Sequence, residues 1–350
     1  MPAFFRDYYA VGLLFLAKIT CIILGFGFTK EVMMKGIRIL GTGSAVGSKV
    51  VDNDELAPSI DSSHEWIYTR SGICSRHLLA EGETGVGITI DAARQAMAAA
   101  RVEPSELGLI IVATSSSESI CPPMACQVAH ALGTKCPAFD INAACSGFIY
   151  MMEVVHNMLP GLQAPALVIG SDMLSRVTDW SDRTSCFLFG DGAGALVVDG
   201  EGEVLASQIM AYPDNDNVLN ITGLNWQDEE GKPVRSCIKM NGREVFKFAT
   251  RQLVEDVRAV LEKAKKNIED IRWFVCHQAN GRILRAAAEK LGVDQSRFFV
   301  NIDKMANTSA ATIPIALHEM FGKGLLHKGD LVMLAAFGGG LTSGAMLLRW

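Results

Sequence analysis

The sequence lacks several features that would assign it to a common class at once. Its nine cysteines are odd in number and scattered, and no C-x-x-C pair or Cys/His ligand cluster occurs, so neither a zinc site nor a disulfide framework is predicted. Charged residues make up only 20% of the chain and the net charge is −6, which argues against wholesale nucleic-acid binding. What is present, 49% apolar residues and 33 glycines in 350 residues, is typical of a globular α/β protein. Reduced thiols favour a cytoplasmic location.

One long apolar run stands out, at 11–28, interrupted by a single lysine. As an α-helix this run would span about 27 Å, so a membrane anchor is one interpretation. The basic residues just downstream would then keep the rest of the chain in the cytoplasm. A cleaved signal peptide fits less well, because one arginine precedes the run and no small-x-small site follows it. We favour an over-extended start, in which 1–33 is an apolar leader and the working protein begins at Met33 or Met34.

After the leader, apolar strands alternate with amphipathic helices, and this order occurs twice. The first half contains a strand at 107–116, a helix in "CPPMACQVAHALG", a strand, turn and helix from "CPAFDINAACSGF", and strands at 164–173 and 192–200. The second half contains a strand within 268–280, a helix at 283–292, a strand, turn and helix over 298–321, and two last strands in "GDLVMLAAFGGGLTSGAMLLRW". The repeat predicts a duplicated βαβ-rich fold, with halves at 34–205 and 206–350, each a mostly parallel sheet covered by helices.

Three polar or reactive residues follow strands at corresponding places in this repeat. Cys145 lies in "ACSG", His277 in "HQAN" and Asn307 in "NTSA". Taken singly, each has a structural interpretation: a small buried thiol, a core histidine and a turn residue. Sites in open α/β sheets form outside the carboxyl ends of strands, so their joint occurrence favours one shared site.

The motifs "ACSGF", "GDGAGA", "HQAN", "NTSAATIP" and "FGGGLTSGA", in this order, resemble the β-ketoacyl-acyl-carrier-protein synthase III family of bacterial fatty-acid synthesis. The resemblance runs from about Lys35 to Trp350. It implies a thiolase fold with layered α-β-α-β-α architecture, a homodimer, a cysteine–histidine–asparagine active site, and neither cofactor nor metal. Within the superfamily, the absence of a cysteine after Cys276 argues against a biosynthetic thiolase, and Asn307 stands where the elongating synthases have a second histidine.

The resemblance implies a decarboxylative Claisen condensation. An acyl group moves from acyl-CoA to Cys145 and then to the carbanion formed from malonyl-acyl-carrier protein. The start of the following helix, with His277 nearby, is expected to lower the pKa of the thiol. His277, through Nε2–H, and the Asn307 amide would donate to the enolate, and the backbone N–H groups of Cys145 and Gly339 would form an oxyanion hole.

The resemblance also implies binding residues on both sides of this site. Trp66 and Arg70 would hold the CoA adenine, and Arg183 and Asn280 its phosphates and pantetheine. The acidic carrier protein would need a basic patch beside the site, predicted at Gln278, Arg282, Arg285, Lys247 and Arg251.

Some alternatives stay open. Cys121 stands where family members commonly have a bulkier residue that closes the acyl pocket, so the primer is acetyl-CoA or a longer or branched acyl-CoA. Arg243 stands where a small polar residue is common. A relative of secondary metabolism, condensing or transferring acyl groups, is the second functional interpretation. A degenerate, non-enzymatic subunit is the third, and it would be expected to lose one of the three site residues.

Overall fold

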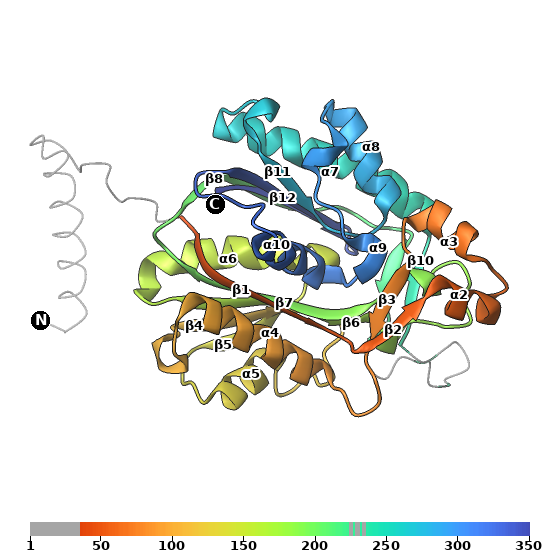
Figure 1. Cartoon of the computed structure of the whole chain (residues 1–350), viewed down its shortest axis with the longest axis horizontal. Coiled ribbons are helices and arrows are strands. Elements are labelled where there is room, and N and C mark those ends of the chain that lie inside the picture. The colour runs from red at the N-terminus through yellow and green to blue at the C-terminus, as the bar shows by residue number, and fades with distance from the viewer. Residues whose placement is uncertain (1–35, 224–226, 228–231, 233–235) are drawn as a thin grey trace, which may run out of the picture. The chain divides into compact units, whose positions relative to one another are not determined.

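The computed structural model describes residues 36–223, 227, 232 and 236–350. Within them, two β-sheets of matching strand order form the framework of the protein (Figure 1). The first sheet has the order β1 (Arg38–Val46), β7 (Asp191–Asp199), β6 (Ala166–Met173), β4 (Leu109–Ala113) and β5 (Ala138–Ile141). The second has the order β8 (Glu203–Ala211), β13 (Thr342–Arg349), β12 (Leu331–Gly338) and β11 (Trp273–Cys276). The division into halves at 34–205 and 206–350 stays a prediction, because residues 36–350 form one compact unit.

Helices cover both outer faces and fill the space between the sheets, which gives the predicted five layers (Figure 1). Helices α4 (Gly85–Ala100) and α5 (Met124–Leu132) pack on the outer face of the first sheet, and α7 (Gly242–Ala264) and α8 (Gly281–Leu291) cover the second. Between them lie α6 (Gly147–Leu162) and α10 (Thr312–Gly322), whose apolar side chains contribute to the core shared by both sheets. The faces that these two helices turn to the core are apolar, while Glu153 of α6 and Glu319 of α10 stand at partly exposed positions.

Two sequence-based predictions about the sheets are wrong. The sheets are mixed rather than mostly parallel: β4 pairs in parallel with β5 and β6, and β11 with β12, but all other pairings in the two sheets are antiparallel. For β12 and β13 the reason is the connection over 339–341, which is far too short for a parallel crossover. The strand predicted to begin at 298 is reduced to an isolated parallel bridge between Phe274 and Phe298.

The repeat is nevertheless visible at single residues. Gly133 ends α5 and Gly292 ends α8, and both have the left-handed conformation, with φ of 72° and 69°. Both are therefore helix stops of the type that favours glycine.

Short elements lie beside the sheets. They are β2 (Lys49–Asp52), α2 (Asn53–Leu56), α3 (His64–Ser71), β3 (Ser75–Leu78), β9 (Leu219–Ile221), β10 (Ile238–Met240) and α9 (Ile302–Met305). Among them, α3, β9 and β10 contribute residues to the cavity described below. Fully buried Arg76 ties several of them together by donating to the carbonyl oxygens of Val51 and Phe187 and to Asn53 Oδ1. These bonds hold the segment that carries Phe187, which lines the cavity described next.

The apolar leader at 1–33, with its alternatives of anchor, signal peptide and over-extended start, lies outside the described residues. Within the described part of the chain, no helix combines the length and apolar character needed to cross a membrane.

Candidate active site

Cys145, His277 and Asn307 all line one cavity of about 1430 Å³. Cys145 lies in the 3₁₀ turn η3 (Ala144–Ser146) between β5 and α6, and His277 directly follows β11. Asn307 precedes the 3₁₀ turn η8 (Ser309–Ala311), which leads into α10 and contacts η3. The equivalent turns predicted from the repeat thus meet at the N-terminal ends of the two central helices.

The backbone around this meeting point is strained. Ala144, Ala306 and Ser309 have φ of 47°, 54° and 51°, in the left-handed region that non-glycine residues rarely adopt. Each such residue costs on the order of 1–3 kcal/mol, so the surrounding structure must hold it in place. Two of these residues immediately precede Cys145 and Asn307, and strain of this kind is typical of functional sites.

Gly338 allows the closest approach to the cysteine turn. A Cβ atom at this position would lie 2.7 Å from the backbone nitrogen of Cys145 and 3.1 Å from that of Ser146. Sequence reasoning selected the neighbouring Gly339 for an oxyanion hole; Gly339 lines the cavity, and its role there stays a prediction. The need for glycine at 338 was missed, because only the folded chain shows which backbone it approaches.

The Cys145 thiol does not have the lowered pKa that the sequence suggested. Its pKa is raised to about 12, chiefly by burial in the cavity; a hydrogen bond with the Ser309 hydroxyl lowers the pKa, and the nearby Asp172 carboxylate adds to the rise. Desolvation of the charged form therefore outweighs the favourable helix start. The resting thiol is protonated.

His277 is also neutral in the resting site. Its side chain is only 1% exposed, and burial lowers the pKa of the imidazole to about 3. Nδ1 lies 2.8 Å from Thr312 Oγ1, and the imidazole forms a T-shaped pair with the Phe337 ring, with ring centroids 5.3 Å apart. Nε2 is thus the nitrogen left for the cavity that His277 lines.

The Asn307 side chain is oriented by the turn that follows it. Its Oδ1 accepts a hydrogen bond from the backbone N–H of Ser309 at 2.8 Å, and its own backbone N–H donates to the carbonyl oxygen of Leu188 at 2.9 Å. With Oδ1 engaged, the amide Nδ2 is the end of the side chain available to the cavity as a donor.

Asp172 is a buried carboxylate that sequence reasoning missed. It is 1% exposed and accepts from the Ser115 backbone N–H at 2.8 Å, from Ser116 Oγ at 2.7 Å and from the Ala310 backbone N–H at 3.3 Å. The carboxylate thereby joins the end of β6 to the turn that follows β4 and to η8. Its position after an apolar strand, in "GSDM", was the only sequence signal.

The predicted CoA residues lie together at one part of the cavity. The guanidinium of Arg70 lies 4.1 Å from the centroid of the Trp66 ring, and that of Arg183 lies 5.8 Å from it. Trp66 and Arg70 line the cavity; Arg183 lies beside it, paired with Asp61. Asn280 lines the cavity too, but its amide is engaged, accepting from Arg282 N and donating to the Arg70 carbonyl oxygen.

The predicted carrier-protein residues fall into two groups. Arg282 and Lys247 are exposed and line the cavity, and Arg285 and Arg251 are exposed on the same two helices, α8 and α7. Gln278 is different: it is 1% exposed, and its amide bonds to the backbone of Cys276, Phe299 and Asn301. The prediction that Gln278 contacts the carrier protein is therefore wrong, because its side chain is fully occupied in the core.

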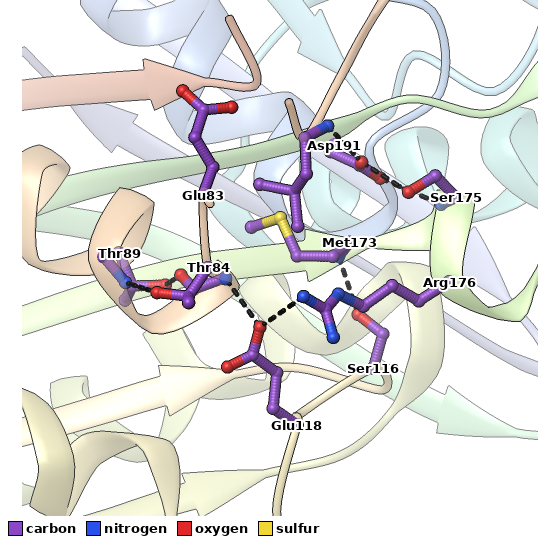
Figure 2. Close-up of polar contacts among 12 residues, drawn as sticks. Glu83, Thr84, Thr89, Ser116, Glu118, Met173, Ser175, Arg176 and Asp191 are labelled. Atoms are coloured by element: carbon purple, nitrogen blue, oxygen red, sulfur yellow. Dashed lines mark hydrogen bonds and ion pairs between the residues drawn. The ribbon is translucent and has the colours of Figure 1, made fainter. Parts of the chain in front are cut away.

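A polar wall of the cavity was also missed. Figure 2 shows Glu118 and Arg176 pointing toward one another; the ion pair measures 2.9 Å, and Glu118 also accepts from the backbone N–H of Gly85. Both side chains line the cavity, as does Ile120, although Ile120 is 71% exposed. Cys121 is exposed as well.

Comparisons with known proteins agree with this geometry. The family model of 3-oxoacyl-[acyl-carrier-protein (ACP)] synthase III matches residues 139–213. A second model, of the C-terminal part of the same family, matches residues 261–350. The chain is 42% identical over 325 residues to the beta-ketoacyl-[acyl-carrier-protein] synthase III of Clostridium acetobutylicum, covering 91% of this chain and 99% of the relative.

Solved structures give the same result. The 3-oxoacyl-[acyl-carrier-protein] synthase III from Aquifex aeolicus superposes with a TM-score of 0.83 at 43% identity, covering 90% of this chain and all of that one. The priming beta-ketosynthase of the R1128 polyketide pathway superposes with a TM-score of 0.82 at 32% identity, covering 90% of this chain and 96% of that one.

Proposed function

The chain belongs to the β-ketoacyl-[acyl-carrier-protein] synthase III family, the condensing acyltransferases that start fatty-acid synthesis, and we propose that it joins a short acyl-CoA to malonyl-acyl-carrier protein. The observation that carries this proposal is the convergence of Cys145, His277 and Asn307 in one cavity, from three separate segments. The products are 3-oxoacyl-acyl-carrier protein, CO₂ and CoA.

In the first half-reaction, Cys145 Sγ attacks the thioester carbonyl of acyl-CoA. The carbon–sulfur bond to Cys145 forms, the bond to CoA breaks, and the proton of the thiol ends on the CoA sulfur. Because the raised pKa keeps the thiol protonated, the attack needs a base at the same moment, and His277 is the neutral base in the cavity.

In the second half-reaction, the malonyl group loses CO₂ and leaves an enolate, whose carbon attacks the acyl carbonyl on Cys145. The carbon–carbon bond forms, the bond to Cys145 Sγ breaks, and the released sulfur takes up a proton from solvent to restore the thiol. The enolate oxygen needs hydrogen-bond donors, and we assign Asn307 Nδ2 to it, because Oδ1 is held by Ser309. A donor of this kind is worth about 10²–10³ in rate. Neither half-reaction as written needs a metal or cofactor, and their absence stays a prediction.

The cavity leads past residues suited to both substrates. Trp66, with Arg70 and Arg183 around its ring, supports binding of the CoA adenine and phosphates. Arg282, Lys247 and the exposed Arg243 give the cavity rim a positive charge, which suits an acidic carrier protein. The pantetheine of either substrate would pass between these groups to Cys145.

We also propose a homodimer, in which a second copy covers the exposed loop at Ile120 and Cys121. What supports a partner here is that Ile120, an apolar side chain, lines the cavity and is 71% exposed, so that a second copy could cover it. The small Cys121 side chain supports a primer longer or more branched than acetyl. Sedimentation equilibrium tests the dimer: a monomer at micromolar concentration would contradict it.

The proposed function is tested by incubating the protein with malonyl-carrier protein and a panel of straight, branched and longer acyl-CoAs, with products identified by mass. We expect 3-oxoacyl-carrier protein together with CO₂. No condensation with any primer would contradict the proposal. The R1128 relative supports a second candidate, a priming synthase of secondary metabolism. Strong preference for a carrier protein from a biosynthetic cluster, over that of fatty-acid synthesis, would favour it.

A further inference from the structure

Asp256 of α7 is a buried carboxyl group that the proposed mechanism does not use. It is 0% exposed. Its Oδ1 accepts hydrogen bonds from Gln208 Nε2 on β8 and from Gln252 Nε2 on the preceding turn of α7, both at 3.1 Å. Oδ2 is also buried, and no donor within the described residues reaches it with hydrogen-bond geometry. An aspartate is almost never buried completely unless it is paired, so its charge state needs an explanation.

The facing strand, β13, presents a second buried oxygen without a hydrogen bond. Ser343 is 0% exposed, and its Oγ has no partner of good geometry in the described part of the chain. Side chains alternate along a strand: Thr342 points to the cysteine turn, where Ser146 Oγ bonds to it at 2.8 Å, so Ser343 points to the opposite face, which α7 covers. The Ser343 hydroxyl is close enough to Asp256 to lower the pKa of the carboxyl. The two unpaired oxygens, Asp256 Oδ2 and Ser343 Oγ, therefore lie together between α7 and β13.

Among the described residues, no cationic side chain pairs with Asp256. The ammonium group of Lys263, two turns further along α7, donates to Gln208 Oε1 at 2.9 Å, so the Gln208 amide stands between Lys263 and Asp256. Arg251 acts instead on the neighbouring Tyr212, whose pKa it lowers. The carboxyl group thus has amide donors around it but no counter-ion in contact.

The other neighbouring groups are neutral or acidic. Glu255 raises the pKa of Asp256, and Asp256 in turn raises the pKa of Tyr150 on α6. Strand β12 consists of apolar residues and glycine, and Lys290 of α8 donates to the carbonyl oxygen of Thr250, six residues before Asp256. An ionised Asp256 would therefore be a buried negative charge surrounded by amides, hydroxyls and further acids.

This charge decides where the proton lies. A carboxyl group that is buried without a cation tends to keep its proton, because desolvation penalises only the charged form. A proton on Asp256 Oδ2 removes the charge and gives Ser343 Oγ a donor, so both unpaired oxygens are satisfied. A bond in the other direction, from the Ser343 hydroxyl to an ionised Oδ2, would pair the same atoms but leave the negative charge buried. Burial, the largest effect, leaves the pKa of Asp256 raised, although hydrogen bonds with Ser343, Gln252 and Gln208 act in the opposite direction.

We propose that Asp256 carries a proton on Oδ2 in the folded protein, and that the resulting hydrogen bond to Ser343 joins α7 to β13. Loss of this proton at higher pH leaves a buried charge at the contact and weakens it. The inference concerns the fold itself and does not depend on the proposed function.

The direction of the pH dependence follows from linkage. A carboxyl group whose pKa is higher in the folded than in the unfolded chain binds its proton more tightly in the folded chain. The stability that it contributes is complete below the unfolded pKa of about 3.9 and is lost as the pH rises through the folded value. Each pH unit in that interval favours unfolding by up to about tenfold.

The contact joins two elements that shape the cavity. Tyr212 and Leu341 exchange backbone hydrogen bonds of 2.8 and 3.1 Å, and Leu341 ends the glycine turn at the start of β13. Helix α7 carries Phe246 and Lys247, which line the cavity. A pH-sensitive contact between α7 and β13 therefore connects the cavity rim to the glycine turn beside the cysteine.

The decisive variant is Asp256→Asn, which keeps the size of the side chain and resembles the protonated acid. Its Oδ1 can still accept from both glutamines, and its Nδ2 can donate to Ser343 Oγ at every pH. Glu262→Gln is the matched control, because it removes one negative charge from an exposed position of the same helix.

The first measurement is equilibrium unfolding of the full chain in urea between about pH 4 and pH 8. We expect the unfolding constant of the wild type, relative to that of Asp256→Asn, to rise with pH by up to about tenfold per unit, and the variant to be the more stable at the highest pH. Glu262→Gln should follow the wild type throughout. The inference is wrong if wild type and Asp256→Asn differ by the same factor at every pH, or if the variant is less stable at high pH or fails to fold.

Infrared difference spectra between the wild type and Asp256→Asn, recorded without substrate, locate the proton itself. We expect the C=O stretch of a protonated carboxylic acid in the wild type at about pH 5, above the ordinary titration of aspartate near 3.9, and its replacement by carboxylate bands at higher pH. Carboxylate bands alone at that pH would overturn the inference, even for a wild type that is fully active in condensation. A wild type that shows the acid band but condenses no acyl-CoA would support the inference and count against the proposed function.

Discussion

The chemistry of single residues in this site depends on desolvation. The start of a helix should favour a thiolate at Cys145, yet burial and the Asp172 carboxylate raise the thiol pKa to about 12. A nucleophile of this kind is inert until substrate and base are both in place.

The first prediction follows from that pKa. The ultraviolet difference spectrum between wild type and Cys145→Ser should show no Cys145 thiolate as the pH rises to about 10, well above the usual titration of cysteine near 8.5. His277→Gln, measured in the same way, controls for any contribution of the imidazole. A thiolate with its midpoint at or below about pH 8 would contradict the account and restore the helix-based expectation.

The second prediction concerns Asn307. Asn307→Asp keeps an oxygen to accept from Ser309 N–H but replaces the Nδ2 donor with negative charge where an enolate must form. Condensation should fall by about 10²–10³ or more, while acylation of Cys145 persists. The acylation step serves as the internal control for folding. A variant that condenses at nearly the wild-type rate would exclude Asn307 from this role.

At the scale of elements, two turns and one strand end build the site. Turns η3 and η8 meet where α6 and α10 begin, and Gly338 at the end of β12 lets a third segment approach the cysteine backbone. The strain in the turns is sustained because the adjoining strands and helices are buried on both sides.

The third prediction tests this approach. Gly338→Ala would put Cβ 2.7 Å from the Cys145 backbone nitrogen, an atom that cannot move without displacing η3. We expect acylation to be nearly abolished and the free energy of unfolding to fall by about 1–3 kcal/mol. Gly161→Ala, in α6 where an added Cβ meets nothing within 4 Å, is the control and should retain full activity. Normal acylation by Gly338→Ala would show that the turn can adjust.

The elements also show what the sequence could and could not predict. Apolar periodicity and glycine stops located most strands and helices, and motif order located Cys145, His277 and Asn307, because these signals are local. Strand direction was predicted wrongly, since an apolar run such as 192–200 has the same composition in either direction. The burial of Gln278 and the raised pKa of Cys145 depend on neighbours distant in sequence, which no local pattern contains.

At the scale of the whole molecule, the net charge of the chain affects how it binds its carrier protein. A chain with a net charge of −6 repels an acidic carrier protein at long range, so docking depends on local positive charge at the cavity rim. Arg282 is exposed there, on the first turn of α8, five residues after His277.

The fourth prediction is that Arg282→Glu raises the KM for malonyl-carrier protein roughly tenfold and weakens its salt dependence, with little change in acylation by free acyl-CoA. Arg94→Glu on α4, which is exposed on the outer face of the first sheet, makes the same change in net charge and should have little effect. If both half-reactions fall equally in Arg282→Glu, the side chain supports the fold or the cavity instead of docking.

The central claim is that one cysteine carries the acyl group between two substrates, and intact-protein mass tests it most directly. On exposure to a reactive acyl-CoA, the wild-type chain should gain the mass of one acyl group, and addition of malonyl-carrier protein should remove it with release of CO₂ and 3-oxoacyl-carrier protein. Cys145→Ser should gain nothing. Acylation that persists in Cys145→Ser, or that maps to Cys186 or Cys276, would contradict the account.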